Sequence, residues 1–145
     1  NFKVNVGIMR IFSTFGPGLK KLVVFDTIKK IKSKSSFKVF GTGNEIRDLA
    51  FVDDQVRTIS LLTKKIKKPQ GNIYNIAAGK PYTIKSIVKK LVKISKKQIS
   101  FEFTNKRRSF DTKNFIADKS KTNKIIGTIK KTPIDVAFHK TYNSI

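Results

Sequence analysis

The sequence predicts an α/β fold in a single domain. Short apolar runs rich in β-branched and aromatic residues alternate with segments of helical periodicity, and turn residues separate them. The length of 145 residues suits one domain. With 39% hydrophobic and 10% aromatic residues, the chain has enough apolar side chains to build a core. No internal repeat or low-complexity segment interrupts the alternation.

The first predicted elements are a strand, a helix and a second strand. Val4 to Phe12 predicts a buried strand that ends at the turn Gly16-Pro17-Gly18. Apolar residues between Leu22 and Ile31 recur at helical spacing with lysines between them, so a helix follows. Phe37 to Phe40 then predicts a short strand.

A turn, a strand and a helix follow. Between two predicted strands, Gly41-Thr42-Gly43-Asn44 is expected to form a hairpin turn. Ile46 to Val52 predicts a strand, and Asp53 or Asp54 is expected to cap the next helix. That helix is expected to end at Lys67-Lys68-Pro69-Gln70-Gly71.

The next helix is the most amphipathic of the chain. It follows a strand predicted over Asn72 to Ile76, and Thr83 is placed to cap it. Its apolar stripe consists of Ile84, Ile87, Val88, Leu91 and Val92, with lysines outside the stripe. A membrane-surface helix also has this pattern, but a surface helix facing the core explains it better.

The last third predicts shorter elements. Ile99 to Phe103 predicts a strand, and Phe115-Ile116 predicts a short extended segment. We expect Asp118 to cap a helix that runs to Ile126-Gly127, and Pro133 to open the last helix in its first turn.

The charge of the chain is strongly positive. There are 32 Lys and Arg residues against 9 Asp and Glu, which gives a net charge of +23. Such a charge attracts polyanions, including nucleic acid, acidic lipid and phosphate-bearing metabolites. However, 27 of the 32 are Lys, spread along the whole chain, and no nucleic-acid-binding motif accompanies them. A basic nucleic-acid-binding domain is therefore kept as the alternative, and nucleic acid is not the expected partner.

Few residues suit catalysis or metal binding. The chain has no Cys and one His, His139, which is interpreted as a surface or interface residue, so no metal site is predicted. No Gly-rich nucleotide loop of the usual kinds occurs. The remaining candidates are Arg10, Arg47, Arg107 and Arg108, which either converge on phosphate oxygens or form structural salt bridges.

Nothing in the sequence predicts a membrane span or a signal peptide, because no run of 18 apolar residues occurs and the first apolar stretch is short. A cytoplasmic location is expected. The chain begins at Asn1 without Met and enters a predicted strand at once, so we expect it to be a piece of something longer.

Five segments carry motifs that occur together, and in this order, in one protein family. They are Arg10–Gly18 (RIFSTFGPG), Val39–Asp54 (VFGTGNEIRDLAFVDD), Asn72–Gly79 (NIYNIAAG), Arg108–Asp111 (RSFD), and Asp118–Lys121 with Ile126-Gly127 (DKSK, IG). They resemble RxFNxYGPG, VxGdGxxxRDfxyVdD, GxxYNiGsG, RPGD, and DxSK with LG of the NAD-dependent epimerase/dehydratase family, the extended short-chain dehydrogenases similar to UDP-galactose 4-epimerase.

The resemblance implies the C-terminal part of a Rossmann-type extended short-chain dehydrogenase, with its small substrate-binding subdomain. Residues 1–145 would then be the mainly substrate-binding portion, and the dinucleotide loop and catalytic Tyr-x-x-x-Lys would lie upstream of Asn1. No catalytic residue is assigned within the chain, since Tyr74, Tyr82 and Tyr142 lack Lys at the fourth following position. The chain alone is expected to be inactive.

The resemblance also implies ligand contacts. Ile11 and Phe12 would line the nicotinamide end of the cleft, and Ser13 the sugar, chiefly through backbone contacts. Lys20 or Lys21 falls near the loop that closes on the nucleotide. The remaining expected contacts are with phosphate and ribose, from Arg47, Arg108 and Asp111. Guanidinium groups suit phosphate oxygens, and a carboxylate accepts hydrogen bonds from two hydroxyls. Ser13 replaces the family's usual Asn, and Phe15 its usual Tyr.

The implied activity is that of a nucleotide-sugar epimerase or dehydratase. In this family, NAD takes a hydride from a sugar carbon, and the keto sugar then either regains the hydride on its other face or loses water. NAD would be bound mainly by the missing half. The partner would be a nucleotide sugar, and the complete protein could be a homodimer. The choices of sugar, reaction and oligomeric state stay open.

Overall fold

The computed structural model describes residues 4, 6–68, 70–106, 109 and 111–145. The strands are β1 (Ile8–Ile11), β2 (Thr14–Phe15), β3 (Ser36–Val39), β4 (Ile46–Asp48), β5 (Ala50–Phe51), β6 (Ile73–Ile76), β7 (Pro81–Thr83), β8 (Ser100–Phe103) and β9 (Asn114–Phe115). The helices are α1 (Leu22–Ser33), α2 (Val52–Lys65), α3 (Ile84–Ser95), α4 (Ser120–Ile126) and α5 (Ile134–Asn143).

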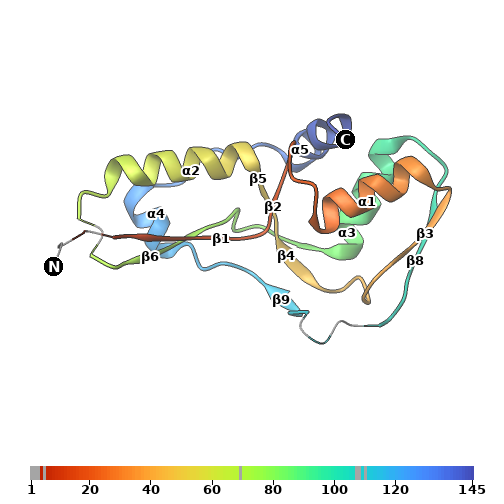
Figure 1. Ribbon diagram of the computed structural model, residues 1–145, viewed down its shortest axis with the longest axis horizontal. Helices are drawn as coiled ribbons and strands as arrows, with labels where there is room; N and C mark the ends of the chain where they lie inside the picture. Colours follow the sequence, from red (N-terminus) through yellow and green to blue (C-terminus); the bar gives the residue numbers. More distant parts are fainter. Residues whose placement is uncertain (1–3, 5, 69, 107–108, 110) are drawn as a thin grey trace.

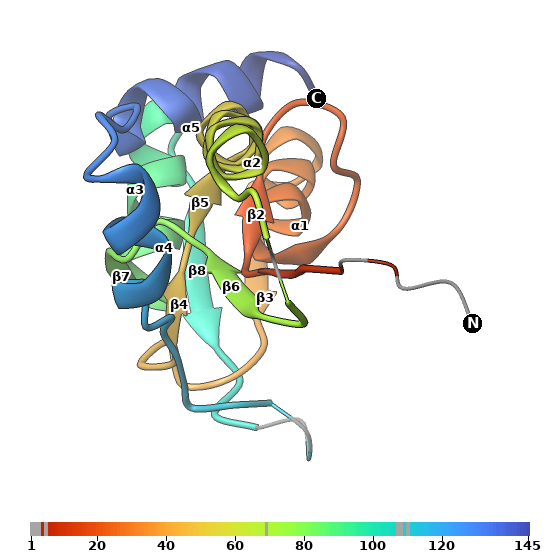
Figure 2. The same ribbon diagram turned by 90° about the vertical axis from the view of Figure 1, so that its left-hand side faces the viewer.

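The strands form small, mainly parallel groups along an elongated molecule (Figure 1). The pairs β1-β6, β2-β5 and β3-β8 are parallel, with Ile8 opposite Ile73 and Phe37 opposite Phe101. In the order β7-β4-β9, β4 is antiparallel to β7 and parallel to β9. Helices α2 and α5 lie on the same side of the strands in both views (Figure 2). The predicted α/β class is confirmed.

The interior is divided between the two ends of the molecule. The main apolar cluster joins α1, α3 and α5 to β3, and its fully buried side chains include Ile28, Ile87 and Phe138. A smaller cluster at the other end contains Leu62 of α2 and Ile76 of β6. Strands β4 and β5 lie between these two ends (Figure 1).

The predicted buried strand Val4 to Phe12 is shorter and more exposed than expected. Strand β1 begins at Ile8, and the side chains of Ile8 and Ile11 are 50% and 55% exposed. Among the described residues, β1 pairs only with β6, and only Met9 of this strand packs against the cluster around Leu62. An apolar strand sequence therefore lies at the surface of this chain.

The predicted hairpin at Gly41-Thr42-Gly43-Asn44 is wrong, because β3 pairs with β8 whereas β4 pairs with β7 and β9. The loop instead wraps around the carboxylate of Glu45, which accepts hydrogen bonds from the backbone N–H groups of Thr42 and Gly43. Gly43 has a φ of +84°, and a Cβ atom there would lie 2.6 Å from Phe103. Pairing between distant segments thus prevails over the local turn signal.

The predicted strand Ile46 to Val52 is divided into β4 and β5, and α2 begins at Val52. The N-cap is Phe51, so the prediction that Asp53 or Asp54 caps this helix is also wrong. Both carboxylates lie in the first helical turn, where negative charge is favourable. Asp54 accepts hydrogen bonds from the backbone N–H and the hydroxyl of Thr132, and so joins α2 to the segment before α5.

The predicted cap and apolar stripe of α3 are confirmed. The hydroxyl of Thr83 accepts a hydrogen bond from the backbone N–H of Ser86. Four of the five predicted stripe residues are buried, and Val92 is half-buried.

The last two helices begin close to the predicted positions, but the N-cap of α4 is Lys119, so the prediction that Asp118 caps this helix is wrong by one residue. The carboxylate of Asp118 accepts a hydrogen bond from the N–H of Ser120, the first residue of α4, and this bond lowers the pKa of Asp118. Helix α5 begins directly after Pro133. Within the described residues, the helices are too short or too polar to span a membrane.

Candidate functional site

A cleft of about 240 Å³ lies between the β1–β2 turn, the first turns of α1, and β4. Its walls bring together residues that are far apart in the sequence. The lining residues are Ser13, Thr14, Leu22, Val23, Val24, Asp26, Thr27, Lys30, Val39, Phe40, Glu45, Arg47, Leu49, Ile84 and Asp111. Helix α1 therefore contributes both apolar and polar residues to the cleft, and β4 and the segment at Asp111 add a guanidinium and a carboxylate.

Arg47 is the best-placed cation of this cleft. It lies in the middle of β4, and its side chain is only 15% exposed. The guanidinium donates hydrogen bonds to the carboxylate of Asp111 and to the backbone carbonyls of Ile46 and Thr112. An arginine has five N–H donors, so these bonds to described residues leave two for a ligand. The cleft thus presents a fixed cation whose remaining donors suit an oxyanion.

The β1–β2 turn is held by hydrogen bonds to α2 and β5. The carbonyl of Ser13 accepts a hydrogen bond from the N–H of Ala50 at 2.9 Å. The side-chain amide of Gln55 donates to the hydroxyl of Thr14 at 3.1 Å and to the carbonyl of Phe12 at 3.4 Å. No described residue bonds the hydroxyl of Ser13, which is therefore available to a ligand in the cleft.

Glu45 also lines the cleft and places a buried negative charge there. Burial alone would raise the pKa of its carboxyl, but hydrogen bonds donated by Thr42 and Gly43 outweigh burial and lower the pKa below its ordinary value of 4.5. Glu45 is therefore ionised at neutral pH. Its role in this chain is to hold the Thr42-Gly43 loop in place.

The structure brings together Ser13, Arg47 and Asp111 among the predicted site residues. Lys21 is exposed and does not line the cleft, whereas its neighbour Leu22 does. Arg108, like Arg107, lies outside the described residues.

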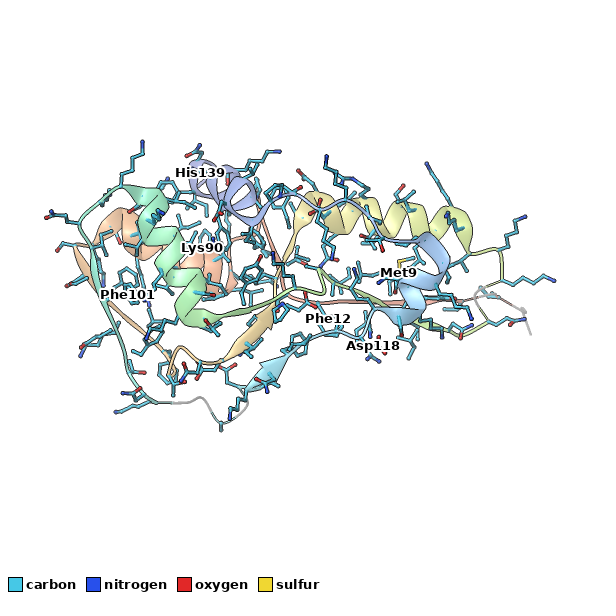
Figure 3. The ribbon with its side chains drawn as sticks, turned by 180° about the vertical axis from the view of Figure 1, so that it is seen from behind. Met9, Phe12, Lys90, Phe101, Asp118 and His139 are labelled. Carbon is cyan, nitrogen blue, oxygen red and sulfur yellow. The ribbon has the colours of Figure 1, made fainter. Side chains whose placement is uncertain are left out.

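The predicted cofactor contacts lie beyond the cleft. Phe12 is buried and stacks on Phe115, with ring centroids 4.7 Å apart, and its N–H donates to the carbonyl of Ile76. Ile11 is exposed at the end of β1. Arg10 is exposed on β1 and does not join Arg47 in the cleft. His139 is exposed on α5, as Figure 3 shows from behind.

Several cleft residues were missed by sequence reasoning. Leu22 lies at the cleft with a φ of +70°, a conformation rare for a bulky residue and one that no local sequence signal indicates. Lys30 and Phe40 reach the cleft only through the packing of α1 against β3. For Glu45, the signal is an acidic residue directly after a Gly-Thr-Gly-Asn loop. Among the described residues, no group of His, Asp and Glu side chains gathers for a metal ion.

Comparison with known proteins gives the family. The model of the NAD dependent epimerase/dehydratase family matches residues 1–77. A UDP-glucuronate 4-epimerase of Thermodesulfobacterium geofontis is 31% identical over 146 aligned positions, which cover 98% of this chain and 43% of that protein. Protein CapI of Staphylococcus aureus is 37% identical over 62 positions. The chain thus spans less than half the length of these relatives.

Solved structures show the same fold. The UDP-glucuronic acid 4-epimerase of Bacillus cereus, in complex with UDP-glucuronic acid and NAD, superposes with a TM-score of 0.88 at 24% identity, over 99% of this chain and 46% of that one. RMD of Pseudomonas aeruginosa, complexed with NADPH, gives a TM-score of 0.84 at 16% identity, over 97% and 48% of the two chains. With the matched family model and this Rossmann-type fold, the chain belongs to the NAD-dependent epimerase/dehydratase family.

Proposed function

We propose that this chain is the C-terminal, mainly substrate-binding portion of an NAD-dependent nucleotide-sugar epimerase or dehydratase. The observation that carries the proposal is the cleft in which Arg47 and Asp111 lie side by side. The guanidinium would bind the diphosphate, and the carboxylate would accept hydrogen bonds from ribose hydroxyls. Arg108, which belongs to the same sequence motif as Asp111, is proposed as a second phosphate ligand.

The substrate class follows from the charge and shape of the cleft. A diphosphate suits the free donors of Arg47, and Lys30 lines the same cleft. The apolar residues of α1 and Phe40 offer a surface for a base or sugar ring. Because the relatives act on UDP sugars by their names, UDP-glucuronic acid is the first substrate to test. Ser13, with its available hydroxyl, would face the sugar.

Only the edge of this chain would contact the cofactor. NAD, when bound, would accept a hydride from the sugar and return it. Ile11 offers exposed apolar surface for the nicotinamide, but the backbone of Phe12 is already bonded to Ile76, Thr14 and Gln55. Phe12 would therefore support the neighbouring residues and would not contact the cofactor through its backbone. Most of the cofactor site would lie in the remainder of the protein.

The test is turnover by the complete protein that carries this chain. UDP-glucuronic acid and UDP-glucose are incubated with it, with and without added NAD, and the sugar is followed by proton NMR. We expect conversion to the C4 epimer or to a dehydrated sugar. Absence of turnover with UDP-, GDP- and dTDP-sugars, in a protein shown to be folded, would contradict the proposal. The 145-residue chain by itself is expected to give no product.

A further inference from the structure

Two lysines meet on the face of the sheet that lies opposite the cleft. Side chains alternate along a strand, so Arg47 faces the cleft and Asp48 faces the other side of β4. On that side, Lys119 and Lys131 line the same small cavity, together with Asp54 and Gln55. Lys119 directly precedes α4, and Lys131 lies in the segment between α4 and α5. The fold therefore brings together two cations from separate segments.

The carboxylates near this lysine pair already have other partners. Asp48 is fully buried and accepts hydrogen bonds from the backbone N–H groups of Gly79 and Ala117. Asp54 accepts from Thr132 and pairs with Arg57. Among the described residues, neither Lys119 nor Lys131 forms an ion pair within 4.0 Å. Two like charges that line one small cavity repel each other, and the loss of a proton or the binding of an anion relieves this repulsion.

There is space beside the pair for a ligand. A cavity of about 20 Å³, which holds about one water molecule, is lined by both lysines and by Gln55. The side-chain oxygen of Gln55 is buried and has no partner. A second cavity, of about 180 Å³, shares Lys131 and Asp54 with the first and adds Lys80 and Thr132. Three lysines thus surround two adjoining cavities.

Gly79 keeps the two lysines close to the sheet. Its φ is +69°, and a Cβ atom there would lie 3.1 Å from Cδ of Lys119 and 3.9 Å from Nζ of Lys131. A side chain at position 79 would therefore crowd Lys119, and it would make only ordinary contact with Lys131. The backbone of Gly79 is fixed through its bond to Asp48, so the position of this glycine beside the two lysines is defined.

We infer that Lys119, Lys131 and Lys80 form a binding site for a small oxyanion, such as sulfate or phosphate, on the face opposite the nucleotide cleft. The anion would lie in the larger cavity against Lys131 and Lys80, with Lys119 behind Lys131. A water molecule in the smaller cavity would donate to the free oxygen of Gln55. The bound anion would join the Ala78-Gly79-Lys80 loop to the segment between α4 and α5.

The site has a measurable electrostatic signature. Without an anion, burial and then the charge of Lys131 lower the pKa of Lys119 to about 8, although Asp48 acts in the opposite direction. The other charged groups facing this region are Asp54 with its partner Arg57, and Lys80. An anion would favour the charged form of Lys119 and raise its pKa toward the ordinary lysine value. Anion binding should accordingly weaken as the pH rises above about 8.

The test uses sodium sulfate, whose charge stays constant over this range, with the complete protein at fixed ionic strength. The pKa of Lys119 is measured by NMR of its side-chain nitrogen, with and without sulfate. We expect sulfate to raise this pKa, and Lys131→Gln to weaken sulfate binding measured by calorimetry about tenfold, the scale of one charged hydrogen bond. Lys130→Gln is the matched control, because Lys130 is exposed like Lys131 but lines neither cavity.

Each outcome decides the inference. A pKa of Lys119 that sulfate leaves unchanged would overturn it, even if sulfate binds elsewhere, for example beside Arg47. Equal weakening in Lys131→Gln and Lys130→Gln would show only general attraction to a basic surface and would also overturn it. Since the NMR readout is made in the unsubstituted protein, a variant that fails to fold does not weaken the test. The result is independent of whether the cleft binds a nucleotide sugar.

Discussion

Arg47 and Asp111 form an ion pair that any ligand in the cleft would have to share or displace. The side chain of Arg47 is 15% exposed and that of Asp111 is 39% exposed, so the pair is partly shielded from water. Asp111 thereby orients the guanidinium before a ligand arrives, at the cost of some competition for its donors. The sequence leaves open whether Arg47 forms a structural salt bridge or binds a ligand; the structure shows the salt bridge, and the ligand contact is the proposal.

Glu45 gives a prediction about stability and pH. Replacing it by Gln removes the charge that holds the Thr42-Gly43 loop, which should lower the free energy of unfolding by about 1 to 3 kcal/mol at neutral pH. The folded-state pKa of Glu45 is depressed, so this contribution is present above pH 4.5 and is lost as the pH falls through the folded-state pKa. Urea denaturation of the complete protein at several pH values measures it.

The exposed Glu102, paired with Lys38 on the surface, is the matched control for this substitution. Glu102→Gln should change stability little at any of these pH values. If Glu45→Gln were as mild as Glu102→Gln, or if its effect persisted unchanged in acid, the assigned role of the Glu45 carboxylate would be wrong.

At the scale of elements, α3 shows which features a sequence can predict. Its cap at Thr83 and its stripe of Ile84, Ile87 and Leu91 depend on residues a few positions apart, and the structure confirms them. The division between β4 and β5 and the loop around Glu45 depend on pairing with β2, β7, β8 and β9, which are distant in the sequence. Local patterns carry no information about such pairing, so these predictions failed.

The cap of α3 can be tested by Thr83→Ala. The variant loses the hydrogen bond from the N–H of Ser86 to the threonine hydroxyl, and the complete protein should lose about 1 kcal/mol of stability. Thr128→Ala, the same change at an exposed loop residue, should have a much smaller effect. Equal losses of unfolding free energy in the two variants, measured by urea denaturation, would argue against the cap.

The candidate site was predictable in part, because some of its residues belong to local sequence motifs and others meet only through tertiary packing. Ser13, Arg47 and Asp111 belong to ordered motifs, and the fold brings them into one cleft. The contributions of α1 and of Phe40 arise only from tertiary packing. The lysine pair at Lys119 and Lys131 had no signal at all in a chain with so many lysines.

Taken as a whole molecule, the chain exposes apolar residues along one strand pair. Ile8, Ile11 and Ile73 on β1 and β6 are all at least 40% exposed. Ile8 and Ile73 are opposite each other in the β1-β6 register, and exposed apolar side chains on neighbouring strands are typical of a surface that another part of a protein covers. The proposed function gives it a role, because in a complete enzyme the dinucleotide-binding part would pack against these strands.

The net charge of +23 is the main support for the alternative, a nucleic-acid-binding domain. Binding of this kind depends on the number of cations and falls steeply as salt increases, but it does not depend on the geometry of one guanidinium. Nucleotide binding in the cleft depends on that geometry. A substitution that keeps the charge and changes the geometry therefore separates the two functions.

The most direct measurement is the affinity of the complete protein for UDP and for duplex DNA, at two salt concentrations, in the unsubstituted protein, Arg47→Lys and Arg57→Lys. Arg57 lies on α2, outside the cleft. We predict that Arg47→Lys weakens UDP binding by about 1 to 3 kcal/mol, since the two-pronged geometry is lost, while Arg57→Lys does not. Unchanged UDP binding in Arg47→Lys, or tight, salt-sensitive DNA binding without UDP binding, would contradict the account.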